Sequence, residues 1–211
     1  MIQDIVIRGS GGHAQEVAYL IEKINQKKPL WNLLGYIDVK DVGMVKCGYK
    51  VIGGDEWFKD KKNFNCIIAI GDPNSKFKVY TELKKYELNF PNIIDPIAKI
   101  GRNTKMGIGN LIMGSVGLST NNKIGNFCLL NGCISVGHDT HLADFVNIMP
   151  FSSIAGNVEV GDKVFIGAGA TIIQGLKVGR ESVVGAGAVV IRNVKDGCTV
   201  FGNPAKIVYQ K

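Results

Sequence analysis

Ile94–Thr120, IDPIAKIGRNTKMGIGNLIMGSVGLST, begins a stretch in which an aliphatic residue or methionine recurs at every sixth position. The recurrence continues without a break to Val190. Its members are Ile94, Ile100, Met106, Ile112, Leu118, Ile124, Leu130, Val136, Leu142, Ile148, Ile154, Val160, Ile166, Ile172, Val178, Val184 and Val190. A fixed period over so long a stretch is typical of a repeat architecture.

The residue that follows each apolar position is often small. It is glycine or alanine at Gly101, Gly107, Gly125, Gly137, Ala143, Ala155, Gly161, Gly167, Gly179 and Gly185. A period of six is three times the period of a strand, so the same side of a short strand returns in every repeat. Three repeats per turn predict a triangular parallel β-helix, with aliphatic side chains inward and glycine or alanine at the tight corners. The handedness does not follow from the spacing.

The first 93 residues follow a different pattern, in which short apolar runs alternate with amphipathic segments. We expect strands at 4–8, 33–37, 51–52 and 66–70, and helices from 14 to about 25 and from 74 to 86. Alternating strands and helices predict a small parallel α/β sheet, which is Rossmann-like. The sequence therefore predicts two domains, 1–93 and 94–211.

Composition narrows the class of protein. The net charge is +7, but the lysines are scattered and form no basic stripe interleaved with aromatic residues, so we expect no nucleic-acid partner. No window approaches twenty apolar residues and the N-terminus lacks a leader pattern, so we expect a cytoplasmic protein with no membrane insertion. The five cysteines include no CxxC pair and are expected to be reduced thiols.

A glycine-rich loop follows the first expected strand and opens the first expected helix. Its sequence is Gly9-Ser10-Gly11-Gly12-His13. Backbone amides at such a helix start suit a phosphate. The spacing also fits a dinucleotide-binding loop, but the domain ends before the second βαβ half that such a fold usually has.

Within the repeat, His138 follows a corner glycine and precedes Asp139. A neutral imidazole can take a proton from an attacking amine or hydroxyl, and an adjacent carboxylate can orient the ring. Gly156 is 18 residues later and is expected directly above His138, where its amide becomes a candidate for an oxyanion hole. Gly167-Ala168 and Gly185-Ala186 are also 18 apart and would form a smooth edge for a pantetheine arm.

These features together resemble the hexapeptide-repeat acyltransferases, and GSGGH followed by a helix is similar to bacterial sugar acetyltransferases related to sialic-acid O-acetyltransferase and UDP-amino-sugar N-acetyltransferase. The resemblance implies a left-handed β-helix, a homotrimer and acetyl-CoA as co-substrate. It also implies a nucleotide-sugar pocket and a catalytic centre. The pocket residues are Gly9, Gly11, Gly12, His13, Asp38, Gly71 and Asp72, and the catalytic residues are His138, Asp139 and Gly156.

The resemblance assigns two further positions. Gly202-Asn203-Pro204-Ala205-Lys206 matches a terminal motif whose lysine lies near coenzyme phosphate, which implies that Lys206 binds acetyl-CoA together with Gly167, Ala168, Gly185 and Ala186. Relatives often carry a second active-site histidine where this chain has Asn147. Asparagine can donate a hydrogen bond to an acetyl oxygen but cannot titrate, so only an oxyanion role is expected there.

We therefore expect an acetyl-CoA-dependent N-acetyltransferase acting on a nucleotide-linked amino sugar. The alternatives are O-acetylation of a sugar of the sialic-acid type and a trimeric scaffold without catalysis. A metal-dependent β-helix lyase of the carbonic anhydrase type needs three histidine ligands, and this chain has only His13, His138 and His141, the first in the other domain. We expect no metal.

Overall fold

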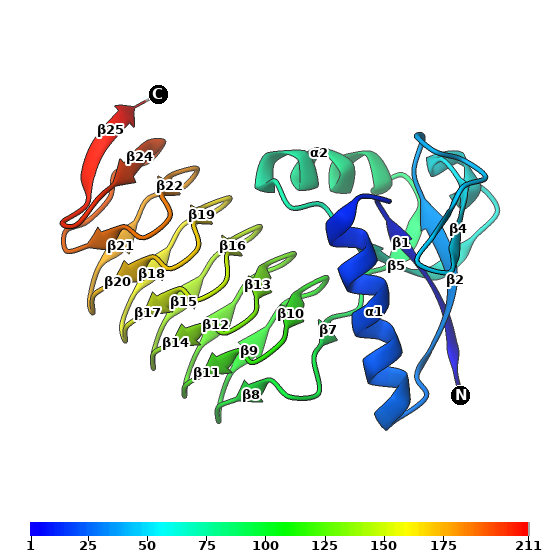
Figure 1. Cartoon of the computed structure of the whole chain (residues 1–211), viewed down its shortest axis with the longest axis horizontal. Helices are drawn as coiled ribbons and strands as arrows, with labels where there is room; N and C mark the ends of the chain where they lie inside the picture. The colour runs from blue at the N-terminus through cyan, green and yellow to red at the C-terminus, as the bar shows by residue number, and fades with distance from the viewer. Residues whose placement is uncertain (211) are drawn as a thin grey trace. The chain divides into compact units, whose positions relative to one another are not determined.

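The computed structural model describes residues 1–210. The chain forms two compact units, and the second begins at Asn92, directly after Pro91. The first is a six-stranded sheet with helices, and the second is a coil of short strands (Figure 1). Each unit is described separately below.

In the first unit, the strand order is β3-β4-β2-β1-β5-β6. The elements are β1 (Gln3–Arg8), α1 (Gly12–Lys27), β2 (Trp31–Ile37), β3 (Val45–Lys46), β4 (Tyr49–Gly53), a 3-10 turn (Asp55–Phe58), β5 (Lys62–Ile68), α2 (Pro73–Leu83) and β6 (Glu87–Asn89). β1 lies at the centre, between β2 and β5, and its residues Ile5, Val6 and Ile7 are fully buried. A fully apolar run in a central parallel strand is the pattern of a sheet covered on both faces.

Two local expectations for this sheet were wrong. The sheet is not purely parallel, because β3 and β4 form an antiparallel hairpin around Cys47 and Gly48, both with positive φ. The strand expected at 66–70 lies earlier, at Lys62–Ile68, because pairing with β1 and β6 extends it through Phe64 and Asn65, which lack an apolar pattern. Both features depend on pairing with neighbouring strands, which the local sequence does not reveal.

The second unit is the predicted β-helix. Its strands are β7 (Ile93–Ile94), β8 (Lys99–Ile100), β9 (Lys105–Met106), β10 (Leu111–Met113), β11 (Gly117–Leu118), β12 (Lys123–Ile124), β13 (Leu129–Asn131), β14 (Ser135–Val136), β15 (His141–Leu142), β16 (Asn147–Ile148), β17 (Ser153–Ile154), β18 (Glu159–Val160), β19 (Phe165–Ile166), β20 (Thr171–Ile172), β21 (Lys177–Val178), β22 (Val183–Val184), β23 (Val189–Val190), β24 (Cys198–Phe201) and β25 (Lys206–Gln210). Three parallel sheets form its faces, and only β25 pairs antiparallel, with β24.

We name the faces by their strand counts. The eight-stranded face has the order β25-β24-β22-β19-β16-β13-β10-β7, the six-stranded face β23-β20-β17-β14-β11-β8, and the five-stranded face β21-β18-β15-β12-β9. Residues 18 apart are register partners, as Leu118, Val136 and Ile154 are on the six-stranded face. All three are buried in one continuous apolar core. The hexad period thus becomes a stack of inward-facing aliphatic side chains, as predicted.

The corners differ from the expectation in one respect. The left-handed backbone conformation falls on the fourth residue of the hexad, for example Asn121 (φ 61°), Asp139 (φ 56°) and Lys163 (φ 57°), and not on the glycine after the apolar residue. Those glycines are needed for lack of space, because the backbone of the next turn lies directly against them. A Cβ on Gly161 would lie 2.6 Å from the amide nitrogen of Arg180.

Candidate active site

His138 lies at the corner that joins β14 of the six-stranded face to β15 of the five-stranded face. Its side chain projects outward and is 57% exposed. Gly137, just before it, has no room for a side chain because the backbone of Gly156 lies against it. The corner therefore presents the imidazole to solvent on a rigid, tightly stacked backbone.

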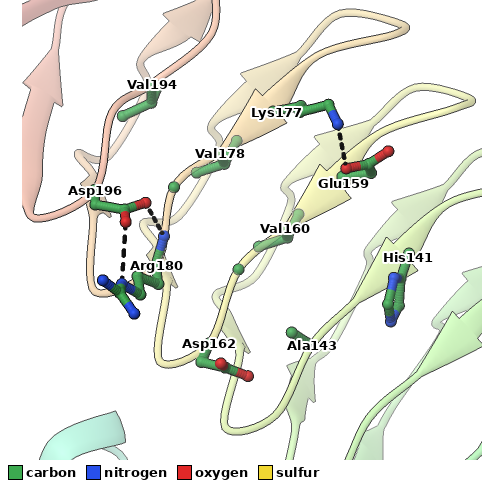
Figure 2. A pocket seen from close by; sticks show the side chains of 12 residues that line it. His141, Ala143, Glu159, Val160, Asp162, Lys177, Val178, Arg180, Val194 and Asp196 are labelled. Carbon is green, nitrogen blue, oxygen red and sulfur yellow. Dashed lines mark hydrogen bonds and ion pairs between the residues drawn. The ribbon is translucent and has the colours of Figure 1, made fainter.

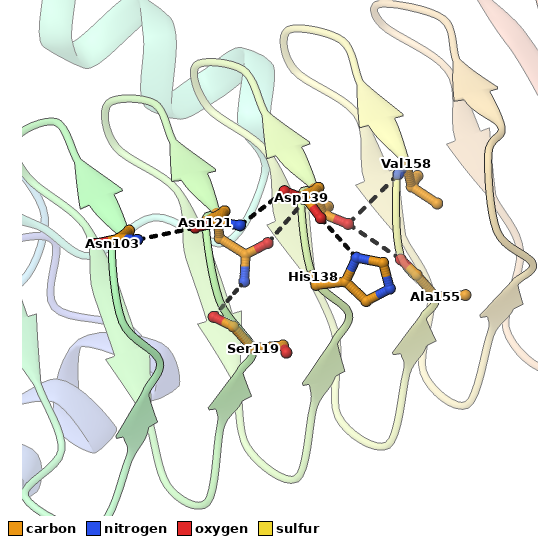
Figure 3. Close-up of polar contacts among 9 residues, drawn as sticks. Asn103, Ser119, Asn121, His138, Asp139, Ala155 and Val158 are labelled. Carbon is orange, nitrogen blue, oxygen red and sulfur yellow. Dashed lines mark hydrogen bonds and ion pairs between the residues drawn. The ribbon is translucent and has the colours of Figure 1, made fainter.

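Asp139 fixes the orientation of this imidazole. Nδ1 of His138 lies 2.7 Å from Oδ2 of Asp139 (Figure 3). This hydrogen bond, and a second one from Asn121, hold the pKa of Asp139 below its usual range. Because an ionised carboxylate only accepts hydrogen bonds, Nδ1 carries the proton and the neutral ring has its lone pair on Nε2. Nε2 is thus the atom placed to accept a proton.

Gly156 lies next to Nε2. A Cβ on Gly156 would be 2.7 Å from Nε2 and 2.9 Å from Cε1 of His138, so the ring occupies the space that any other residue would need. The carbonyl of Gly156 accepts a hydrogen bond from Gly175, whereas its N–H donates to no protein atom among residues 1–210. The expected stacking of Gly156 on His138 is present, with an amide available to a ligand.

The residues predicted to bind the coenzyme lie at another corner. Gly167-Ala168 and Gly185-Ala186 follow β19 and β22, where the eight-stranded face meets the six-stranded face. Ala168 and Ala186 are exposed, and the glycines are close-packed, with a Cβ on Gly167 reaching 2.6 Å from the amide nitrogen of Ala186. Lys206 is exposed at the start of β25. The two groups of residues therefore flank opposite edges of the six-stranded face.

Asn147 does not join His138 within one chain. It is fully buried in β16 of the eight-stranded face. The oxyanion role predicted for it finds no support at the His138 corner of the same chain.

The glycine loop of the first unit lies where the strand order reverses, at the carboxyl ends of β1 and β5, which is where open α/β sheets bind ligands. Gly9 has φ 116°, and a Cβ there would lie 2.9 Å from the carbonyl oxygen of Ala69. At Gly11 and Gly12 a Cβ would meet open space. The loop therefore packs against β5 through Gly9 and leaves its outer side accessible.

His13 sits at the start of α1 and has one committed and one uncommitted nitrogen. Nδ1 lies 3.3 Å from Oε2 of Glu16. Nε2 is buried without a hydrogen-bond partner among residues 1–210. Burial lowers the pKa of His13 most strongly, the nearby charge of Lys76 lowers it further, and Glu16 opposes both. A neutral His13 offers Nε2 as an acceptor for a ligand hydroxyl or N–H and supplies no charge to a phosphate.

The remaining predicted pocket residues have local partners. Asp38 accepts hydrogen bonds from the hydroxyl of Ser10 (3.1 Å) and the amide of Lys40 (3.0 Å). Asp72 caps α2 by accepting from the amide of Ser75 at 2.7 Å. Gly71 is exposed, with open space where a side chain would be. Asp38 and Asp72 therefore stabilise the local backbone just after β2 and just before α2.

Sequence patterns did not single out Lys46, which contacts Ser10 of the glycine loop. Its Nζ contacts the carbonyl of Ser10 at 3.0 Å, the hydroxyl of Ser10 at 3.2 Å and Oδ2 of Asp41 at 2.6 Å. Lys46 comes from the unpredicted β3-β4 hairpin, so no spacing in the sequence linked it to the glycine loop. Lys46 therefore places a positive charge at the glycine loop, and the distribution of lysines along the sequence did not predict this position.

A separate hollow of about 490 Å³ lies on the five-stranded face (Figure 2). His141 lines it beside two ion pairs, Lys177 with Glu159 at 2.8 Å and Arg180 with Asp196 at 3.0 Å. His141 is exposed and points from β15, away from the corner that carries His138.

Two kinds of feature are absent from residues 1–210. No group of three or more histidine, cysteine, aspartate or glutamate residues is placed to hold a metal ion. None of the helices described has both the length and the apolar composition needed to cross a bilayer.

Comparison with known families identifies both units. Residues 4–83 match the PglD N-terminal domain, residues 139–174 the bacterial transferase hexapeptide (six repeats), and residues 157–192 the hexapeptide repeat of succinyl-transferase. No curated protein sequence matches the chain.

Solved structures match over the whole chain. A mutant of perosamine N-acetyltransferase from Caulobacter crescentus, in complex with CoA and GDP-perosamine, is 28% identical with a TM-score of 0.88, covering 100% of this chain and 99% of that one. The acetyltransferase domain of PglB from Neisseria gonorrhoeae, in complex with acetyl coenzyme A, is 26% identical with a TM-score of 0.90, covering 99% and 100%. WeeI from Acinetobacter baumannii is 28% identical with a TM-score of 0.88, covering 98% and 100%.

The order of the two units, the hexad coil and these matches agree throughout the chain. The expected left-handed β-helix and the expected sugar-acetyltransferase relationship are both confirmed. The chain belongs to the acetyl-CoA-dependent hexapeptide-repeat acetyltransferases that carry a PglD-type N-terminal domain.

Proposed function

We propose that the protein transfers an acetyl group from acetyl-CoA to the amine of a nucleotide-linked sugar. The observation that carries the proposal is the corner at His138, where Nδ1 is held by Asp139 and Nε2 lies against Gly156, in the space that a side chain there would occupy. A perosamine N-acetyltransferase in complex with CoA and GDP-perosamine, 28% identical over the whole chain, supports the same chemistry.

In the proposed reaction, Nε2 of His138 takes a proton from the sugar amine, and the nitrogen lone pair attacks the thioester carbonyl carbon. The amide of Gly156 stabilises the oxyanion that forms. Collapse of this intermediate breaks the carbon–sulfur bond, and the thiolate of coenzyme A leaves and takes up the proton. Asp139 keeps the proton on Nδ1 and stabilises the imidazolium while Nε2 is protonated.

The first unit would hold the nucleotide, with the glycine loop and Lys46 at its phosphates and Nε2 of His13 as a hydrogen-bond acceptor. Binding an unreactive part of the substrate positions the reacting amine and lowers the barrier. A free sugar would make none of these contacts. The nucleotide should therefore affect kcat/KM and not only binding.

We expect kcat/KM to fall at least tenfold when the nucleotide is removed from a 4-amino sugar acceptor, and about tenfold when His13→Ala is tested with the intact acceptor. Acetyl transfer to the nucleotide-linked sugar, the free amino sugar and free sialic acid is measured with wild type and His13→Ala. Equal values for the first two acceptors would refute the nucleotide-binding role. A preference for sialic acid would establish O-acetylation in its place.

We also propose a homotrimer, because the catalytic and coenzyme residues flank opposite edges of the six-stranded face. One chain cannot bring its two edges together. In a three-fold assembly with the six-stranded faces toward the axis, the His138 edge of one chain meets the Gly167–Ala168 edge of the next.

Light scattering is expected to give a mass of three times 22.8 kDa. Ser153→Arg places a bulky cation on the six-stranded face and should dissociate the trimer, because like charges would meet at the axis. His141→Arg also places an arginine on the surface, but on the five-stranded face, and should leave the mass of the assembly unchanged. A wild-type monomer at micromolar concentration, or dissociation by His141→Arg alone, would reject this arrangement.

A further inference from the structure

We propose that Asn121 is a positioning residue for His138, acting through Asp139 from the preceding turn of the coil. Nδ2 of Asn121 donates to Oδ1 of Asp139 at 3.0 Å, while the other carboxylate oxygen takes Nδ1 of His138 at 2.7 Å (Figure 3). The inference rests on the proposed function insofar as it treats His138 as the base. The orientation of His138 would then depend on a residue in the preceding turn of the coil, 18 residues before Asp139.

The hydrogen-bond chain extends one turn farther, and its direction follows from its chemistry. Because the carboxylate of Asp139 only accepts, Asn121 must present its NH₂ to it and its carbonyl to the other side. Nδ2 of Asn103 then donates to that carbonyl oxygen at 3.1 Å. The amide of Asn121 thus points its positive end toward Asp139, which favours the charged carboxylate, whereas Asn103 contacts only Asn121.

The backbone prepares these side chains for their contacts. Asn103, Asn121 and Asp139 all have positive φ, at 60°, 61° and 56°, a conformation that asparagine and aspartate tolerate better than most residues. The amide of Asn121 donates to the carbonyl of Arg102 at 2.9 Å, and that of Asp139 to Thr120 at 3.0 Å. These backbone hydrogen bonds fix the corners that carry the side chains.

The hydrogen-bond chain from Asn103 through Asn121 to Asp139 lies at the corner that carries His138, and the other two corners differ from it. The corner between the five- and eight-stranded faces has Phe127 stacked on Phe145 and Lys163 paired with Glu181 in the equivalent left-handed positions. The remaining corner has Cys133, Phe151 and glycines there. Left-handed corners therefore do not require asparagine. Asn126 also donates to a carboxylate one turn later, that of Asp144 at 3.0 Å, but neither residue has positive φ and no histidine among the described residues is bonded to that carboxylate.

Asn121→Gly removes the donor and keeps a residue suited to positive φ. We expect it to lower kcat about tenfold, the usual scale for losing a group that orients a catalytic ligand, without lowering Tm. Asn103→Gly is the matched control, with the same backbone conformation but no contact with Asp139, and should change kcat less than twofold. Combined with Asp139→Gly, Asn121→Gly should have no further effect, because its action passes through that carboxylate.

A tenfold loss that persists in the Asp139→Gly background would overturn the proposal, as would an equal loss from Asn103→Gly. Nitrogen NMR of the imidazole ring reports its protonation without any acetyl acceptor. The chain has only three histidines, so the variants His13→Gln and His141→Gln assign the signals to individual residues. Wild type should show Nδ1 of His138 protonated, and Asn121→Gly should shift the ring toward the other tautomer. Unchanged ring signals would refute the positioning role even if the true acceptor were not a nucleotide-linked amine.

Discussion

His138→Asn is expected to lower kcat by about a hundredfold or more, the usual contribution of a general base, while the protein stays folded. The imidazole is the group whose uncommitted nitrogen faces Gly156, and asparagine has no titratable atom to replace it. The side chain is largely exposed, so its replacement leaves no cavity in the core. Steady-state acetyl transfer to a nucleotide-linked amino sugar measures the loss, and thermal unfolding measures the fold.

His141→Asn is the control for this variant. It removes the other histidine of the coil, three residues away, from the five-stranded face, and should leave kcat within twofold of wild type. If His138→Asn turned over the correct acceptor at a near-normal rate, another group would have to be the base. Equal losses in both variants would point to a general disturbance of the coil.

Gly156→Ala should also reduce kcat by about a hundredfold, by a steric route. The new methyl group would lie 2.7 Å from Nε2 of His138, so the ring must leave its place over Gly156. Displacing a catalytic group by an ångström is enough for a loss of this size. Gly156 does not have positive φ, so alanine meets no backbone penalty, and Tm should change little.

Gly117→Ala provides the matched comparison for this substitution. It adds the same methyl group on the six-stranded face, where the nearest atom would be 3.9 Å away, and should keep kcat. A Gly156→Ala enzyme with wild-type kcat and an unshifted His138 ring would contradict the stacking of these two residues. A large drop in Tm would show that crowding of the next turn, and not the ring, dominates.

The sequence predicted the β-helix because the aliphatic residues of its core recur at every sixth position, a period that can be seen in the sequence itself. The aliphatic residues of the six-residue repeat, such as Val136 and Ile154, lie in the apolar core. The strand at 51–52 was expected and lies within Tyr49–Gly53, but its hairpin partner Val45–Lys46 was missed because a strand of two residues gives no local signal. The hairpin forms through pairing of β4 with β2, a contact that the sequence does not display.

The same distinction holds for the candidate site. The spacing of 18 predicted that Gly156 would lie over His138, and the position of Asp139 next to His138 predicted a carboxylate that could orient the ring. The catalytic roles of these residues stay predictions. Asn121 and Lys46 were not found, because an exposed asparagine or lysine looks like any other surface residue until its partners in another turn or hairpin are known.

The stack of turns at the His138 corner constrains how the length of this chain can change. Asn103, Asn121 and Asp139 meet because each is 18 residues from the next. Loss of a single residue between Asn121 and Asp139 would rotate every later side chain to the wrong side, exposing core positions and separating His138 from its supports. Loss of a complete turn would restore the alternation of inward and outward residues. Length variation in such a coil is therefore tolerated in whole turns, and a change of one residue is a larger perturbation than a change of eighteen.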